Sequence, residues 1–317
     1  MPGDQATWQT AASWLFVPGD RADRFDKAVG SGADMVILDL EDAVAPTAKS
    51  DARRAVTRWL AQGRSACVRI NPAGTPYHDD DVSALTACDV VASVMVPKAE
   101  DPDALAWMGE RLPSVPVVAL VETAVGIDRA RDLAAALAGR GRLAFGSVDF
   151  SLDIGAADAE LPMLMARSTL VLASRVAALP PPVDGVTTAL DDLQQLEADA
   201  RRSAALGFTG KLCVHPRQVP TVNQAFTPDP GDVERARRVL AAVEGVGALA
   251  VDGEMVDRPV IEQARRTLAR VRHHGRDVAT PASPGAPAGT PPPSVAGVPD
   301  RSSTPTFGRC GPEEARP

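Results

Sequence analysis

The sequence comprises 317 residues, of which 45% are hydrophobic and 23% charged, so the chain can form a sizeable core. The 33 Lys and Arg residues against 41 Asp and Glu residues give a net charge of −8, which argues against a nucleic-acid-binding protein. The longest strand-like apolar run, 114–121, is too short for a membrane helix, and the N-terminus shows no secretory signal. Four cysteines form no paired motif. Composition therefore predicts a cytoplasmic metabolic protein that binds neither nucleic acid nor membranes.

Short apolar runs alternate with helix-like segments along the chain. The runs lie at 14–17, 35–38, 67–70, 94–96, 117–121, 143–145, 183–184 and 211–214. Successive runs are about 28 residues apart, the length of one strand and one helix, and amphipathic patterns over 50–63, 126–139 and 190–207 fit between them. Continuous hydrophobicity within the runs is typical of parallel strands covered on both faces. We therefore predict an α/β fold, a (β/α)₈ TIM barrel.

The remaining sequence divides into two parts. Helical patterns over 231–246 and 258–272 flank a loop at 251–259. Residues 277–317 contain ten of the 28 prolines, interspersed with Gly, Ser, Thr and Ala, and cannot bury enough apolar surface to fold. The prediction is a barrel domain over 1–230, a C-terminal helical segment over 231–276, and a disordered tail over 277–317.

Polar side chains follow nearly every predicted strand, at the end where barrel enzymes carry their catalytic groups. They include Asp39 and Glu41 after the second run, Arg69 in the third, Glu122 after the fifth and Asp149 after the sixth. For any one of them a helix cap or a buried ion pair explains its presence equally well. Together they favour a functional site.

The residue types in this ring indicate a particular chemistry. Glu122 and Asp149 follow neighbouring strands and could hold a hard divalent cation such as Mg²⁺ through oxygen. No zinc-binding, P-loop or dinucleotide-binding motif competes. Arg69 offers a guanidinium to a substrate carboxylate or thioester oxygen. A Mg²⁺ ion with an arginine suits reactions that develop an enolate, because both stabilise oxyanion charge.

Two histidines are weaker candidates. His215, before a proline at the end of the eighth run, could be a base but is more often a hydrogen-bonded structural residue in such a position. His78 lies in the polar stretch YHDDD, and we expect it to be solvated.

The strand ends also form a recognisable set of motifs. They read LFVPGDRADRFDKA (15–28), ADMVILDLEDAV (33–44), VRIN (68–71), VMVPKAE (94–100), ALVETAVGI (119–127), LAFGSVDFSLDIG (143–155), GFTGKLCVHPRQV (207–219) and DGEMVDRP (252–259). On these motifs, which span about residues 13–270, the sequence resembles the citrate lyase β-subunit-like acyl-CoA lyases of the HpcH/HpaI aldolase/citrate lyase family. The resemblance implies a Mg²⁺-dependent barrel enzyme, trimeric or hexameric, in which the segment over 231–276 is a lid.

The resemblance further implies an activity. The expected enzyme is a carbon–carbon lyase that cleaves or forms a 3-hydroxyacyl-CoA thioester of the malyl-, citramalyl- or citryl-CoA type. Its products are a 2-keto acid and, through an enolate, acetyl-CoA or a homologue. Hydrolysis of the thioester would add a synthase or thioesterase outcome.

The same resemblance assigns roles to residues near the barrel. Glu122 and Asp149 are the implied metal ligands, with Glu122 also facing the substrate. Arg69 contacts the substrate's oxygens, and Asp39 and Glu41 assist catalysis by ordering metal-bound waters or Arg69.

Further implied contacts lie at the sixth strand, the first helix and the lid. Backbone amides at Gly146, Ser147 and Val148 bind the 2-keto-acid carboxylate. Arg24 and Lys27 lie near the CoA phosphates. Asp257 closes with the lid over a neighbouring subunit's site and acts as acid or base.

One departure and three alternatives accompany this interpretation. Many relatives read GAED where this chain has Gly146-Ser147-Val148-Asp149, so the substrate of this chain can differ from theirs. A CoA-independent 2-keto-acid aldolase is one alternative, and a citrate lyase β subunit acting on an acyl-carrier-protein thioester is another. A catalytically inactive scaffold is the third, and the retention of the acidic and arginine residues together argues against it.

Overall fold

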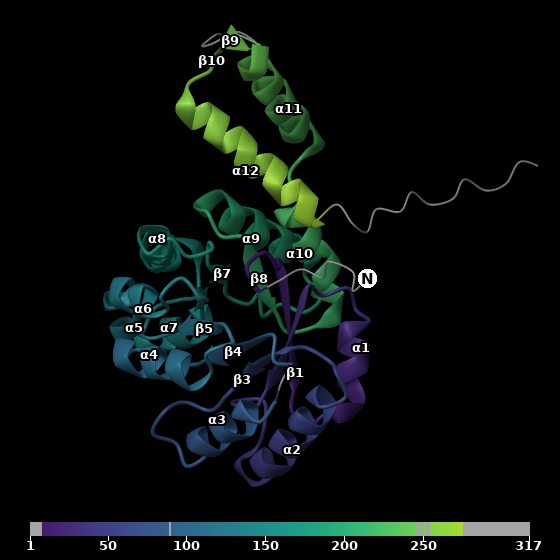
Figure 1. Ribbon diagram of the computed structural model, residues 1–317, viewed down its shortest axis with the longest axis vertical. Coiled ribbons are helices and arrows are strands. Elements are labelled where there is room, and N and C mark those ends of the chain that lie inside the picture. Colours follow the sequence, from purple (N-terminus) through teal and green to yellow (C-terminus); the bar gives the residue numbers. More distant parts are fainter. Residues whose placement is uncertain (1–7, 89, 246–249, 252–253, 275–317) are drawn as a thin grey trace, which may run out of the picture. The chain divides into compact units, whose positions relative to one another are not determined.

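The computed structural model describes residues 8–88, 90–245, 250–251 and 254–274. Eight parallel strands close into a barrel in sequence order, with β8 paired to β1 (Figure 1). The strands are β1 (Ser13–Pro18), β2 (Met35–Asp39), β3 (Cys67–Arg69), β4 (Ser93–Val96), β5 (Val117–Val121), β6 (Gly141–Phe145), β7 (Val183–Asp184) and β8 (Gly210–Cys213). The predicted (β/α)₈ barrel is confirmed.

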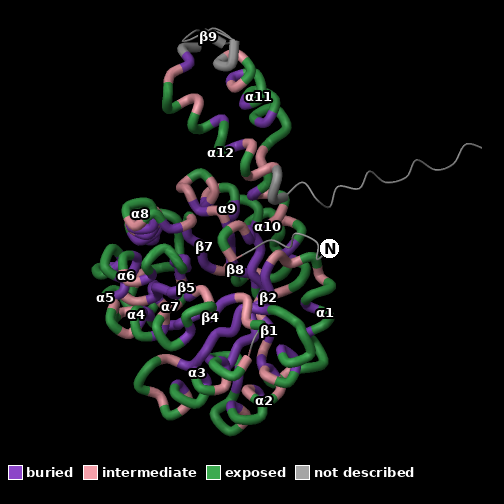
Figure 2. The backbone as a smooth tube through the Cα atoms, viewed as in Figure 1, coloured by how far each residue is buried: buried purple, intermediate pink, exposed green. Residues whose placement is uncertain are grey.

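Helices connect the strands and cover the barrel. They are α1 (Phe25–Val29), α2 (Lys49–Leu60), α3 (His78–Thr86), α4 (Pro102–Arg111), α5 (Ala124–Asp128), α6 (Ala130–Ala136), α7 (Ser147–Asp153), α8 (Glu160–Val176), α9 (Leu193–Leu206) and α10 (Val219–Phe226), with 3₁₀ turns η1 (Ala22–Arg24), η2 (Pro46–Ala48) and η3 (Pro216–Gln218). Figure 2 shows the strands largely buried and the outer helix faces exposed. The main core therefore lies between barrel and helices. Among the described residues, no helix combines the length and apolarity needed to cross a membrane.

The sequence periodicity predicted some helix boundaries better than others. Helix α9 begins where the Asp192 side chain accepts a hydrogen bond from the Gln195 amide, and it ends at Gly207, whose φ of +106° favours glycine. The single helix predicted over 126–139 is instead interrupted at Arg129, whose φ and ψ of −94° and 10° lie outside the helical region. This residue's guanidinium donates to the Glu100 carbonyl, so a contact outside the helix accompanies the break.

Strand alternation determines which side chains enter the barrel. Trp14, Ile37, Cys67, Leu120 and Ala144 belong to the inner cluster, while their sequence neighbours face the helices. Residues two positions later along the same strands therefore also point inward, at the carboxyl end of the barrel. Those residues are Phe16, Asp39, Arg69, Glu122 and Gly146, and they form the layer that carries the site.

The opposite end of the barrel is closed by a buried arginine. Arg142 on β6 donates to the carbonyls of Trp8, Ala11 and Pro181 and to the Thr209 hydroxyl at 2.7–3.1 Å. Burial lowers its pKa to about 9, which still leaves the group charged at neutral pH. Neutral oxygens therefore compensate its charge, and the residue ties together chain segments that are distant in sequence.

Two further helices follow the barrel in the sequence. Helices α11 (Pro230–Gly245) and α12 (Arg258–His274) pack on each other through a small cluster that includes Ala236, Val239 and Ala264. The predicted loop over 251–259 overlaps a short antiparallel pair, β9 (Ala250–Val251) and β10 (Glu254–Met255). The predicted tail over 277–317 lies outside the described residues, and the domain boundaries at 230 and 276 stay predictions.

Candidate active site

Glu122 is a buried carboxylate at the carboxyl end of β5. Its side chain is 2% exposed, and Oε1 accepts a 2.8 Å hydrogen bond from the Lys98 amide. Gly146, the residue after β6, lies beside Glu122, because the residues that precede these two, Phe145 and Val121, are paired in the sheet. A Cβ at Gly146 would lie only 2.5 Å from Glu122 Oε2, so the glycine leaves room for the carboxylate. The sequence therefore places a poorly solvated acid at the mouth of the barrel.

Arg69 forms a bidentate ion pair with Asp39. Its Nε and Nη2 donate to the two Asp39 oxygens at 2.7 and 2.6 Å, and the guanidinium stacks over Phe16 at 4.7 Å from the ring centroid. Asp39 also accepts from the amides of Glu41 and Ala43 at 2.9 and 3.1 Å. The carboxylate thus holds both the guanidinium and the turn after β2.

Glu41 joins this cluster from the same turn. It is 3% exposed, with Oε2 at 3.0 Å from Arg69 Nη1 and Oε1 at 2.9 Å from Lys98 Nζ. The Oε2 atom makes no hydrogen bond of good geometry, so its contact with Arg69 is an ion pair only. Glu41 therefore links the arginine to the lysine after β4.

Sequence reasoning did not assign two cations of the cluster. Lys98 contacts both Glu41 and Glu122. The motif VMVPKAE contains this lysine, but no role was predicted for it. Lys49 is 7% exposed and donates to the carbonyls of Leu40 and Glu41 at 2.8 and 2.7 Å. The position of Lys98 directly after a predicted strand was a usable signal. No linear signal marked Lys49, because the contact depends on how α2 packs.

Negative charge accumulates around Glu122. Its pKa is raised to about 8, first by burial and then by the nearby charges of Glu41 and Asp149. Burial likewise raises the pKa of Glu41. For Arg69, the hydrogen bonds and charges of Asp39 and Glu41 outweigh the effect of burial and raise its pKa. An added cation beside Glu122 would relieve this repulsion.

The residues between Gly146 and Asp149 form the first turn of α7. Asp149 is half-buried, Val148 is 40% exposed, and the buried Ser147 hydroxyl donates to Asp158 at 3.0 Å. The Gly146 amide donates to the Val121 carbonyl, so it is not available to a ligand. The predicted backbone carboxylate site is thereby reduced to the amides that follow Gly146.

The other predicted residues lie on separate elements. Arg24 and Lys27 are exposed on η1 and α1, after β1. Asp257 is half-buried and caps α12 by accepting from the Val260 amide at 3.2 Å. Their roles toward CoA and the thioester stay predictions.

The two histidines both make structural contacts. His215 caps η3 through Nδ1, which accepts from the Arg217 amide. The expectation that His78 is solvated is wrong: it is 8% exposed, its Nδ1 lies 2.9 Å from the Asn71 carbonyl, and its ring packs near Trp107.

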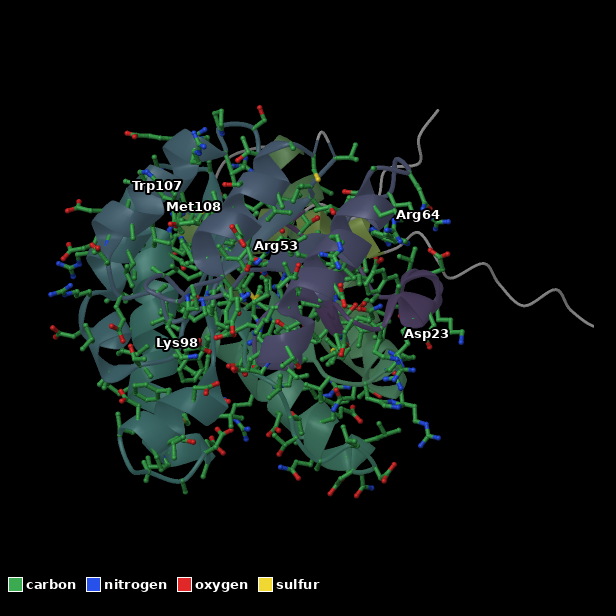
Figure 3. The ribbon with its side chains drawn as sticks, turned by 90° about the horizontal axis from the view of Figure 1, so that it is seen from below. Asp23, Arg53, Arg64, Lys98, Trp107 and Met108 are labelled. Atoms are coloured by element: carbon green, nitrogen blue, oxygen red, sulfur yellow. The ribbon has the colours of Figure 1, made fainter. Side chains whose placement is uncertain are left out.

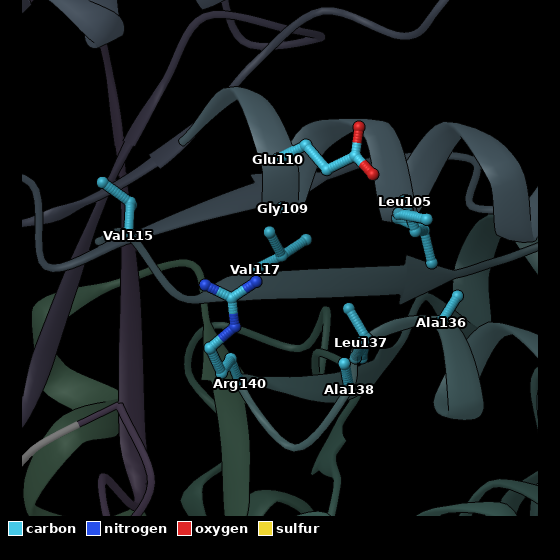
Figure 4. A pocket seen from close by; sticks show the side chains of 10 residues that line it. Leu105, Gly109, Glu110, Val115, Val117, Ala136, Leu137, Ala138 and Arg140 are labelled. Carbon is cyan, nitrogen blue, oxygen red and sulfur yellow. The ribbon is translucent and has the colours of Figure 1, made fainter. Parts of the chain in front are cut away.

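A separate cavity of about 180 Å³ lies between α4, β5 and α6 (Figure 4). It includes Val117, the first residue of β5, and Arg140, which precedes β6, so it lies at the amino end of these strands. Its position excludes it from the carboxylate cluster at the opposite strand ends.

Comparison with known proteins identifies relatives of the whole barrel. Residues 12–216 match the HpcH/HpaI aldolase/citrate lyase family, and residues 174–276 match a family of carbon–carbon bond lyases of the TIM-barrel fold. The chain is 38% identical to a citrate lyase subunit beta-like protein of Deinococcus radiodurans, over 81% of this chain and 96% of the relative. It is 34% identical to a (3S)-malyl-CoA thioesterase of Cereibacter sphaeroides, over 81% and 93%.

A solved structure extends the similarity to three dimensions. The CitE protein of Mycobacterium tuberculosis, in complex with magnesium, acetoacetate and coenzyme A, is 37% identical to this chain. The two structures superpose with a TM-score of 0.72, covering 83% of this chain and 99% of that one.

Proposed function

Because the chain belongs to the HpcH/HpaI aldolase/citrate lyase family, a family of lyases, we propose that it is a Mg²⁺-dependent carbon–carbon lyase acting on a 3-hydroxyacyl-CoA thioester. Substrates of the malyl-, citramalyl- or citryl-CoA type fit the proposal, since they yield a 2-keto acid and acetyl-CoA or a homologue. The observation that carries it is the buried Glu122 beside Asp149, within one charged cluster that also holds Arg69.

Glu122 and Asp149 fit a magnesium ion. Both supply hard carboxylate oxygens, and the pKa of Glu122 near 8 reflects a local excess of negative charge that a divalent cation would relieve. In the part of the chain that the structure describes, no group of three or more His, Cys, Asp or Glu side chains is arranged to hold a metal. Two carboxylates suffice for Mg²⁺, because water and substrate complete its shell. Bound there, the ion would act as a Lewis acid toward the substrate's oxygens.

The proposed cleavage breaks the C2–C3 bond of the thioester. The 3-hydroxyl gives its proton to solvent water, the C3–O bond becomes a carbonyl, and the electron pair of C2–C3 passes into the thioester as an enolate. Arg69 opposes the developing oxyanion charge with its guanidinium, held in place by Asp39 and Glu41. The enolate carbon then takes a proton, for which Asp257 is the proposed donor. Transfer of water to the thioester at the same site would give free CoA, the reaction named for the Cereibacter relative.

CoA and the 2-keto acid would contact opposite sides of this cluster. We assign the exposed Arg24 and Lys27 to the CoA phosphates, because their cations are not buried in the core. The first-turn amides of α7 after Gly146 are the proposed donors to the 2-keto-acid carboxylate, and no side chain of the N-cap occupies them.

Self-association is the second element of the proposal. Helix α8 is apolar on its buried face and again on its outer face, where Leu161, Met165, Leu172 and Val176 are 80, 63, 58 and 60% exposed. Large apolar side chains gathered on an exposed helix face commonly mark a contact with another protein surface. A second copy of the chain is the proposed cover, which supports a homo-oligomer, trimeric or hexameric, with exchange of the α11–α12 lid. Met165→Lys is expected to shift the mass in light scattering to that of the monomer. An unchanged mass would remove α8 from the interface.

The decisive experiment combines the purified protein with Mg²⁺ and malyl-, citramalyl- and citryl-CoA, with products followed by mass. Acetyl-CoA with the matching keto acid would establish the lyase and name the substrate. Free CoA with an intact hydroxy acid would indicate a thioesterase. Glu122→Gln should abolish turnover, whereas Glu197→Gln, at an exposed helical ion pair, should not. Absence of turnover with all three thioesters would overturn the CoA lyase and favour an acyl-carrier-protein substrate or a CoA-independent aldolase.

A further inference from the structure

Lys98 has an unusual backbone conformation for its position. Its φ is +48°, and within the described residues only Ala138 and Ala178 share a positive φ without being glycine. Those two alanines follow the ends of α6 and α8, where the left-handed conformation commonly terminates a helix. Lys98, whose side chain is labelled in Figure 3, follows β4, so helix termination does not explain its conformation. The conformation is strained for a residue with a Cβ, and the surrounding contacts must compensate.

The turn at Lys98 directs its amide into the site. The Lys98 N–H donates to Glu122 Oε1 at 2.8 Å, whereas the next amide, that of Ala99, donates to the Leu120 carbonyl at 3.0 Å. The Lys98 amide therefore takes no part in the backbone hydrogen bonding between β4 and β5, which resumes at the Ala99 amide. The amide so released binds the carboxylate proposed to hold Mg²⁺.

The side chain of the same residue reaches a second carboxylate. Lys98 Nζ lies 2.9 Å from Glu41 Oε1, and Glu41 Oε2 lies 3.0 Å from Arg69. Both carboxylates are at most 3% exposed, while the lysine side chain is 43% exposed. Lys98 thus contacts two buried acids from the solvent side.

We propose that Lys98 is a positioning residue of the site, with its amide orienting Glu122 and its ammonium holding Glu41 against Arg69. One strained residue thereby sets the geometry of both carboxylates. The inference rests on the proposed function for its effects on turnover and on Mg²⁺ affinity, but not for its effect on stability, which the double-mutant cycle below measures.

Three substitutions of Lys98 separate the role of its backbone amide from the role of its side-chain ammonium. Lys98→Gly removes the cation but accepts a positive φ, so the amide should stay on Glu122. Lys98→Val also removes the cation, and its branched Cβ disfavours a positive φ, so the amide should move away. Lys98→Arg keeps a cation. By calorimetry, Lys98→Gly should bind Mg²⁺ within about threefold of the wild type, and Lys98→Val about tenfold more weakly, since a hydrogen bond to a charged group is lost.

Turnover tests the ammonium. We expect kcat of Lys98→Gly to fall about tenfold with little change in KM, because the lysine acts through Glu41 and Arg69 rather than on the substrate. Lys98→Arg should recover most of this loss. A double-mutant cycle of Lys98→Gly with Glu41→Gln, measured by urea unfolding, tests the same contact without turnover and should be non-additive.

Ala138 supplies a matched control for strain. Ala138→Gly and Ala138→Val should differ in melting temperature in the same direction as the two Lys98 variants, but should bind Mg²⁺ like the wild type. Equal Mg²⁺ affinity of Lys98→Gly and Lys98→Val would overturn the role of the amide. Wild-type kcat in Lys98→Gly, or additivity in the cycle, would overturn that of the ammonium. An inactive wild type with the expected Mg²⁺ and cycle results would reject the proposed function while supporting the positioning role.

Discussion

The pKa of Glu122 predicts that magnesium affinity depends steeply on pH. Magnesium needs the ionised carboxylate, and with a pKa of about 8 this group is half ionised at pH 8 and only about 1% ionised at pH 6. The apparent dissociation constant for Mg²⁺ should therefore rise about 50-fold as the pH falls from 8 to 6, which corresponds to about 2 kcal/mol of binding free energy. In excess Mg²⁺ the stabilisation of the folded state should fall by the same amount, lowering the melting-temperature shift by on the order of 5 °C.

The apoprotein should show the opposite trend. The folded-state pKa of Glu122 lies above its usual value of 4.5, so its contribution to stability is complete below pH 4.5 and is lost as the pH rises through 8. Thermal melts with and without MgCl₂ across pH 6–9 measure both effects. Glu122→Gln should remove the pH-dependent part of the magnesium shift, and Glu197→Gln, at an exposed site, should leave it intact. A magnesium affinity that is constant from pH 6 to 9 would refute the reasoning, since Glu122 would then be ionised throughout.

Three further predictions follow from contacts around the barrel. Gly146→Ala should weaken Mg²⁺ binding at least about tenfold in calorimetry and should also lower stability, because the new Cβ would lie 2.5 Å from both Cβ and Oε2 of the buried Glu122; unchanged affinity would contradict it. Arg69→Lys should lower kcat/KM about 100-fold, since an ammonium cannot make the bidentate pair with Asp39; near-normal kinetics would show that the fork is dispensable. Arg142→Met should lower the free energy of unfolding in urea by about 3 kcal/mol, because the substitution leaves buried carbonyls without a hydrogen-bond donor. A smaller change would indicate that water replaces the guanidinium.

Much of the barrel could be predicted because its strands are short, continuously apolar and evenly spaced. Every predicted strand overlaps an observed one, even the two-residue β7. Asp39, Arg69 and Glu122 could be placed at one end of the barrel because Asp39 and Glu122 directly follow an apolar run and Arg69 lies near the end of one. Their mutual contacts are a consequence of closing the barrel.

Contacts between distant segments could not be predicted in the same way. His78 is buried and lies near Trp107 on a different helix, whereas the polar residues around it in the sequence predicted a solvated environment. The bonds of Lys49 to the turn after β2 depend on the placement of α2. The positive φ of Lys98 has no sequence signal, since a lysine carries none of the preference of glycine for that conformation.

The arginine at the floor of the barrel has a consequence for biosynthesis. Arg142 binds carbonyls near the start of the chain and the Thr209 hydroxyl beside β8, and β1 pairs with β8. A nascent chain synthesised from its N-terminus therefore exposes one edge of β1 until about 200 further residues have left the ribosome. Until then Trp14 and the unpaired β1 edge present apolar surface and free backbone groups. We therefore expect ring closure to be a late step of folding, with one edge of the first strand unpaired until β8 has been synthesised.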